Sequence, residues 1–145
     1  MRSGSDLYQL IILLSKPKTI GVGKLGLFSF PAGYYVYTGS AKNELNARIA
    51  RHIRGRKKMH WHIDFLLRYG RIVKVNRYQN TNLYECNLNQ RTENKHGSKI
   101  IAPRFGSSDC NCRSHLIYFE KPRHFSSKCY FDDYAPESRG LVRLY

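Results

Sequence analysis

Short apolar runs separated by turn-forming residues occupy the first forty positions, and this spacing constrains the fold more than any other feature. The runs are β-prone, and a further short strand lies within the Gly-, Pro- and Lys-rich stretch 15–26. Pro31-Ala32-Gly33 is a turn signal between two of the runs. We therefore expect strands over 7–14, 19–22, 27–30 and 34–38. Together they predict an antiparallel meander.

Helical and strand patterns alternate in the rest of the chain. Leu45, Ile49 and Ile53 recur every four residues, which predicts a helix that begins at a cap on Asn43 and ends at Gly55. Helices are also expected over 61–69 and 80–91, and strands over 71–78 and 116–119. The sequence predicts an α+β fold in which a small, mainly antiparallel sheet is flanked by helices. One domain would span 1–121, with 122–145 as a packed or loosely attached C-terminal extension.

Positive charge is concentrated in one part of the chain. The 145 residues include 25 Lys and Arg against 10 Asp and Glu, giving a net charge of +15. The candidate nucleic-acid-binding residues are Lys42, Arg51, Arg54, Arg56, Lys57 and Lys58. Such a concentration favours a polyanionic partner, nucleic acid before an anionic membrane surface, over a merely solvated helix face and basic loop. We expect DNA before RNA, and we also consider a homodimer.

The apolar runs, the N-terminal residues and the cysteines argue against a membrane-spanning, secreted or disulfide-rich protein. The longest unbroken apolar run, 10–14, is far shorter than the ~20 residues that span a bilayer. The N-terminal residues carry no cleavage site of a secretory signal. Four cysteines at this length do not indicate a disulfide scaffold. We therefore expect a cytoplasmic protein with no membrane partner.

A tyrosine, an arginine and a histidine form the strongest candidate site. Tyr37-Thr38-Gly39 ends a predicted strand in a sharp turn, and the next predicted helix carries Arg48 and His52 on one face. This pattern places a phenol, a guanidinium and an imidazole around one groove. Arginine binds phosphate oxygens through its planar fork, and the histidine can hydrogen-bond to the phenol or orient it.

These residues resemble the motifs of the GIY-YIG nuclease superfamily. Tyr37-Thr38-Gly39 resembles its second motif, and Tyr8 resembles the tyrosine of its first motif, with Asp6 at the usual glycine. Asn43, Leu45, Arg48 and His52 resemble its helix pattern, and Glu85 its metal-binding glutamate. Tyr8 and Tyr37 are 29 positions apart, more than in the family, so we expect an inserted hairpin. Blocks at 31–37, 48–52, 60–64 and 105–110 resemble an uncharacterised branch of small archaeal and bacterial proteins.

The resemblance implies an endonuclease that hydrolyses phosphodiester bonds with one Mg²⁺ or Mn²⁺ ion. Glu85 would bind the ion, and Tyr8, or less favourably Tyr37, would take the proton from the attacking water. Arg48 would neutralise the scissile phosphate. Arg48, His52 and the metal would have to favour the phenolate. The alternative is a catalytically inactive nucleic-acid-binding module of the same fold.

Cysteine and histidine residues suggest a second, less favoured metal site. Cys110, Cys112 and His115 resemble part of a zinc site, with His124 or Cys129 as a fourth ligand. The Cys-x-Cys spacing departs from the usual zinc-binding pattern, so buried thiols beside a turn are the favoured interpretation. Zinc is accordingly not the expected cofactor.

Two further segments are candidates for the edge of the groove. His60 and His62 would point to opposite sides of a helix, so we expect them to hold a loop or the groove edge with Asp64, rather than to bind a metal. Trp61 is expected in the core. The segment 107–109 is a further candidate for the groove lining.

Overall fold

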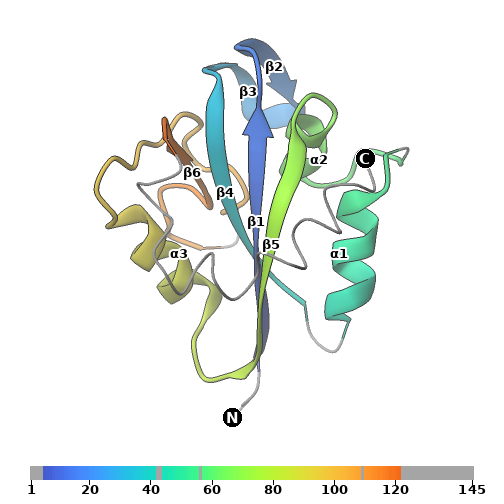
Figure 1. Cartoon of the computed structure of the whole chain (residues 1–145), viewed down its shortest axis with the longest axis vertical. Helices are drawn as coiled ribbons and strands as arrows, with labels where there is room; N and C mark the ends of the chain where they lie inside the picture. Colours follow the sequence, from blue (N-terminus) through green and yellow to red (C-terminus); the bar gives the residue numbers. More distant parts are fainter. Residues whose placement is uncertain (1–4, 42–43, 56, 109, 122–145) are drawn as a thin grey trace.

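Four antiparallel strands form the central sheet of the computed structural model, which describes residues 5–41, 44–55, 57–108 and 110–121. The strands are β1 (Ser5–Leu14), β4 (Gly33–Ser40), β5 (Arg71–Thr81) and β6 (Leu116–Phe119), and their order in the sheet is β5-β1-β4-β6 (Figure 1). Each of the four was predicted from the sequence, although β5 continues three residues beyond its predicted end. Together with three helices, this confirms the predicted α+β class.

A separate hairpin replaces the predicted meander. The strands β2 (Lys18–Val22) and β3 (Gly26–Phe30) are joined by a short 3-10 turn, η1 (Gly23–Leu25), and pair only with each other. The predicted meander is therefore wrong, because β1 pairs directly with β4 on one side and β5 on the other. The physical reason is that β1 is buried on both faces and takes the centre of the sheet, whereas β2 alternates between exposed and buried residues. The hairpin is the insertion expected between Tyr8 and Tyr37.

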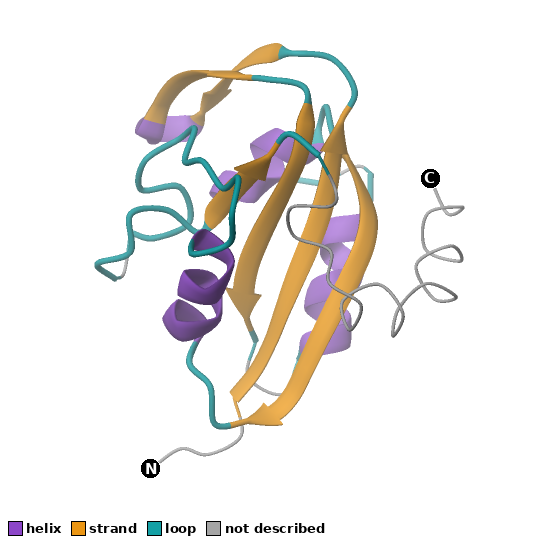
Figure 2. Ribbon diagram, turned by 60° about the vertical axis from the view of Figure 1, so that its left-hand side comes forward, coloured by secondary structure: helices purple, strands orange, loops and turns teal. Residues whose placement is uncertain are grey.

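Three helices flank the sheet at the predicted places. They are α1 (Leu45–Ile53), α2 (His62–Leu67) and α3 (Glu85–Glu93), and α1 and α3 lie on opposite sides of the central strands in both ribbon views (Figures 1 and 2). The third helix begins later than predicted, because the chain is still a strand at Thr81. The predicted cap Asn43 lies outside the described residues. No helix in the described ranges is long and apolar enough to cross a membrane.

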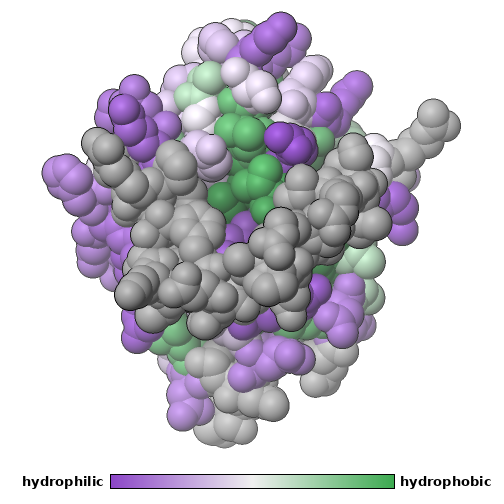
Figure 3. All heavy atoms as spheres, viewed as in Figure 1, coloured by the Kyte–Doolittle hydropathy of each residue, from purple (hydrophilic) through white to green (hydrophobic). Residues whose placement is uncertain are grey.

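Alternate residues of β1 enter two hydrophobic clusters. Leu10, Ile12 and Leu14 join the main core with residues of α1, α2 and the hairpin, whereas Ile11 faces the other way. Ile11 packs in a smaller cluster with Val36, Ile117 and Phe119. Side chains of a strand alternate between the two faces of the sheet, so β1 anchors both clusters. Figure 3 shows hydrophobic side chains gathered over the upper part of the central strands.

The register of β1 and β4 places Tyr8 opposite Gly39. A Cβ atom on Gly39 would lie 2.5 Å from both the hydroxyl oxygen and the Cζ atom of Tyr8. Glycine at this position therefore lets the tyrosine ring pack directly against the backbone of β4. The glycine of the Tyr-x-Gly motif thus has a structural role, because its lack of a side chain leaves the space that the Tyr8 ring fills.

We expect Gly39→Ala to destabilise the protein by about 1–3 kcal/mol, the usual range for overpacking a filled site. The added methyl group has to displace the Tyr8 ring, and urea denaturation measures the cost. Gly21→Ala is the matched control in another strand, because its Cβ would meet only a Leu27 methyl group, at 3.7 Å. Equal midpoints for the two variants would contradict this explanation.

Candidate active site

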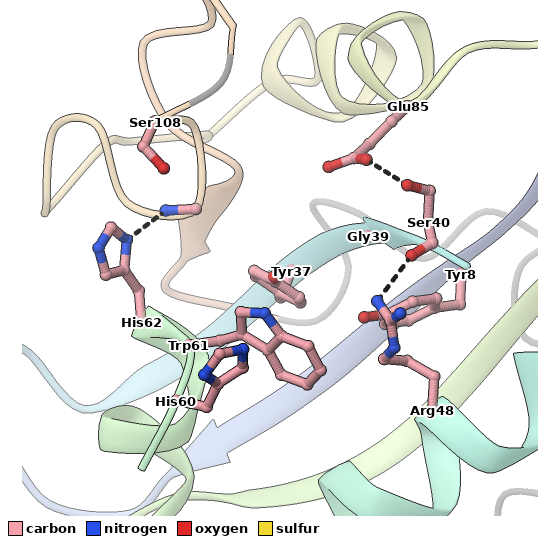
Figure 4. A pocket seen from close by; sticks show the side chains of 11 residues that line it. Tyr8, Tyr37, Gly39, Ser40, Arg48, His60, Trp61, His62, Glu85 and Ser108 are labelled. Carbon is pink, nitrogen blue, oxygen red and sulfur yellow. Dashed lines mark hydrogen bonds between the residues drawn. The ribbon is translucent and has the colours of Figure 1, made fainter. Parts of the chain in front are cut away.

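A cavity of about 280 Å³ lies where β4 ends and α1 and α3 begin (Figure 4). Its lining comprises Tyr8, Tyr37, Gly39, Ser40, Arg48, His60, Trp61, His62, Glu85, Gly106 and Ser108. Four of the five residues predicted to carry chemistry are among them, each from a different element: β1, β4, α1 and α3. The fifth, His52, is buried behind the cavity. The structure thus brings Tyr8 and Glu85 to one cavity, although they are 77 positions apart in the sequence.

Tyr8 is held by a hydrogen bond to His52. The hydroxyl oxygen of Tyr8 lies 2.8 Å from Nε2 of His52, and both side chains are almost completely buried. Burial lowers the pKa of His52 to about 4, and the Asp64 carboxylate opposes this only in part. His52 is therefore neutral at neutral pH and acts on Tyr8 as a hydrogen-bonding partner, not as a positive charge.

Burial keeps the two phenols of the cavity protonated. It raises the pKa values of Tyr8 and Tyr37 above the ordinary range, and the positive charge of Arg48 lowers both without outweighing burial. Arg48 thus acts in the direction expected from the sequence, whereas neutral His52 adds no charge that would favour a phenolate. Either phenol needs a further cation nearby to ionise near pH 7.

Ser40 connects the cation and the carboxylate of the cavity. Its backbone oxygen accepts a hydrogen bond of 3.0 Å from Nη1 of Arg48, and its hydroxyl donates one of 2.7 Å to Oε1 of Glu85 (Figure 4). The Arg48 guanidinium also lies 4.8 Å from the centre of the Trp61 ring, a cation–π distance. These contacts fix the Arg48 head group at the cavity wall.

Glu85 is the first residue of α3, where the helix dipole favours a negative charge. Its second oxygen, Oε2, lies 2.7 Å from Nδ1 of His115, so each carboxylate oxygen has one partner within the protein. A carboxylate offers about four acceptor sites, which leaves one on each oxygen for a ligand in the cavity. One such carboxylate completed by water molecules is an ordinary environment for Mg²⁺.

A buried carboxylate supports the wall that carries Trp61. Asp64 accepts hydrogen bonds of 2.9 and 3.1 Å from Arg51 and of 2.8 Å from the backbone N–H groups of His60 and Trp61. Burial raises the pKa of Asp64, but these hydrogen bonds outweigh it, so the net shift is downward. His62 holds the neighbouring loop, because its Nδ1 accepts from the Gly106 N–H at 2.8 Å. Asp64 and His62 thus hold the groove edge, as predicted, whereas the other predicted residue, His60, is exposed and lines the cavity.

The predicted nucleic-acid-binding residues fall into three groups. Arg51 pairs with Asp64 and also donates to the Lys58 carbonyl, so it has a structural role. Lys57 donates to the carbonyl oxygens of His52 and Arg54. Arg54 and Lys58 are exposed, whereas Lys42 and Arg56 lie outside the described residues. Of the six predicted residues, Arg54 and Lys58 are therefore the described ones whose side chains are exposed.

The sequence did not reveal the position of Cys86. Cys86 lies with Cys110, Cys112 and His115, and the ligand atoms of all four are within 4.8 Å of one another. No spacing rule indicates this, because Cys86 is separated from the other three by a long loop; the one local signal is its place beside Glu85. The fourth ligands considered from the sequence, His124 and Cys129, lie outside the described residues. Sequence reasoning also missed Ser40 and Gly106 as cavity residues.

One family model matches the chain, over residues 7–132, and its description is a domain of unknown function, DUF123. The match covers most of the sequence, so the chain belongs to this family. No curated protein and no solved structure matches the chain. The family assignment therefore leaves the activity open, and the cavity is the basis for assigning a function.

We expect the free energy of unfolding to fall as the pH is lowered from about 6.5 to about 4. In this window the unfolded chain takes up a proton at His52 and the folded chain does not, which is worth up to about 3 kcal/mol. Urea denaturation across this pH range measures the loss, and His52→Gln should reduce it. His60→Gln, which removes an exposed imidazole, is the matched control. An identical pH dependence in wild type and His52→Gln would contradict the prediction.

Proposed function

We propose that this protein is a divalent-metal-dependent endonuclease that hydrolyses phosphodiester bonds, acting in the cytoplasm and on DNA in preference to RNA. The observation that carries the proposal is the meeting of Tyr8, Arg48 and Glu85 in one cavity, on three different elements. A phenol, a guanidinium and a carboxylate are the groups that the resemblance to GIY-YIG nucleases assigns to this reaction. The net charge of +15 supports a polyanionic substrate.

Glu85 is the residue that would hold Mg²⁺ or Mn²⁺. Its two oxygens are oriented by Ser40 and His115 and keep acceptor sites directed to the cavity. When bound, the ion supplies positive charge that stabilises the leaving oxygen. Arg48 neutralises the charge that builds on the phosphate. Its contacts with Ser40 and Trp61 already hold the guanidinium in place, so the side chain does not have to reorganise during the reaction.

Tyr8, in its phenolate form, is the group that orients the attacking water and receives its proton. Of the two phenols, Tyr8 has the additional hydrogen bond to His52, which fixes the direction of its hydroxyl group. Burial raises the pKa of Tyr8, and Arg48 opposes this effect. Activity should therefore increase with pH over the range in which the phenol becomes ionised. His52 is a positioning residue in this scheme.

Cleavage assays on labelled duplex, branched and single-stranded DNA and on RNA, with Mg²⁺ or Mn²⁺, test the proposal. We expect metal-dependent cleavage that Glu85→Gln and Arg48→Gln each reduce by about 100-fold or more, because each removes a charge aimed at the reacting phosphate. The matched controls are Glu120→Gln and Arg91→Gln, which remove the same charges at exposed positions outside the cavity lining. They should retain wild-type rates.

Tight binding without cleavage of any substrate would contradict the nuclease proposal. It would instead support the inactive nucleic-acid-binding module considered as the alternative. Equal loss of cleavage in the Glu85 variant and in its Glu120 control would also contradict it, because the effect would then not belong to the cavity. Thermal melting of each variant checks that it is folded.

Binding to duplex DNA should weaken steeply as salt is added, because bound phosphates release counterions. Replacing Arg54 and Lys58 together with Ala should make the slope of log K against log salt shallower by about 1 for each phosphate that the variant no longer binds. The double variant Lys24→Ala/Arg91→Ala removes the same charge from exposed positions on the hairpin and α3, and should keep the wild-type slope. Equal slopes in all three proteins would place the phosphate-binding residues elsewhere.

A further inference from the structure

Three cysteines and one histidine meet beside the cavity, on the side of α3 and the loop that follows it. Cys86 is the second residue of α3, and Cys110, Cys112 and His115 come from the segment between α3 and β6. Cys112 and His115 are buried, and Cys86 and Cys110 are partly buried. Three cysteines and one histidine are one of the usual ligand sets of structural zinc sites.

Two sulfur–nitrogen distances in the cluster agree with tetrahedral coordination, and all four ligand atoms lie within 4.8 Å of one another. Nε2 of His115 lies 3.5 Å from Sγ of Cys110 and 3.8 Å from Sγ of Cys86. Zinc binds sulfur at about 2.3 Å and nitrogen at about 2.0–2.1 Å, so tetrahedral angles place a sulfur and a nitrogen ligand about 3.6 Å apart. The two separations in the structure, 3.5 and 3.8 Å, lie on either side of this value. His115 presents Nε2 to the thiols, while its other nitrogen faces Glu85.

We propose that Cys86, Cys110, Cys112 and His115 bind one structural zinc ion that fixes the loop between α3 and β6. Among the described residues of this loop, the buried hydrophobic side chains other than Cys112 are Ala102 and Phe105. A loop this long without regular structure needs further anchoring, and a metal that joins it to a helix supplies it. The same loop contributes Gly106 and Ser108 to the cavity wall.

The site is also linked to Glu85, and this part of the inference rests on the proposed function. Nδ1 of His115 donates to Oε2 of Glu85, while Nε2 faces the thiols. A histidine zinc ligand ordinarily donates its other N–H to a carboxylate or carbonyl oxygen, which fixes the ring and strengthens the ligand. One oxygen of Glu85 therefore orients the zinc ligand His115, while the remaining acceptor sites of the same carboxylate face the cavity.

Metal analysis of the full-length protein tests the inference without any nuclease assay. Protein loaded with Zn²⁺ and freed of excess metal by gel filtration should contain about one zinc ion per chain by mass spectrometry. Cys86→Ser should lower zinc affinity by more than about 100-fold in a chelator competition, because a direct ligand is removed. Cys129→Ser is the matched control and should retain the ion. Zinc lost from the Cys129 variant and kept by the Cys86 variant would overturn the ligand set.

A second readout does not depend on the folding of a variant. Wild-type protein loaded with Co²⁺ should show the sulfur-to-cobalt charge-transfer band and the intense visible bands of a tetrahedral thiolate site. Absence of the sulfur band, or protein that contains no zinc after loading, would overturn the inference, as would iron in place of zinc. Glu85→Gln should weaken zinc binding by about 10-fold, and unchanged affinity would refute the link to Glu85. A protein that binds zinc but cleaves nothing would reject the nuclease proposal alone.

Discussion

The pairing of β1 with β4 determines where every group in the cavity lies. It sets the Tyr8 ring against Gly39 and ends β4 at Ser40, whose carbonyl and hydroxyl groups point to two different helices. Arg48 from α1 binds the carbonyl, and Glu85 from α3 binds the hydroxyl. One strand end therefore holds a cation and an anion beside a phenol. A shift of this register by one residue would turn Tyr8 to the other face of the sheet and separate it from both charges.

Burial, more than charge, sets the protonation of the groups around Tyr8. The phenols of Tyr8 and Tyr37 remain protonated and His52 remains neutral, because a charge on any of them would have to be desolvated. Arg48 opposes this effect for both phenols but does not reverse it. A bound divalent cation would add positive charge beside the same phenol, which is why the proposed reaction depends on Glu85.

The parts predicted from the sequence are those encoded by local patterns. The stripe of Leu45, Ile49 and Ile53 predicted α1, because burial of one helix face imposes a period of about four residues. The short apolar runs predicted the strands, because a strand buried on both faces is apolar at consecutive positions. The start of α3 was predicted too early, because the polar end of β5 resembles a helix cap. The partner of Arg51 was missed: its ion pair with Asp64 joins two helices through tertiary packing, which no local pattern encodes. Cys86 was missed for the same reason.

Adjacent positions on α3 explain why the two proposed metal sites belong together. Glu85 and Cys86 are consecutive in the first turn of the helix, so their side chains leave it in directions about 100° apart. One turn can thus present a carboxylate to the cavity and a thiol to the neighbouring cluster. A structural metal bound by Cys86 would fix the rotation of α3 about its axis, and with it the direction of Glu85. When few other protein ligands bind Mg²⁺, the position of the ion depends mainly on the direction of this one carboxylate. Fixing that direction in advance therefore matters most at such a site.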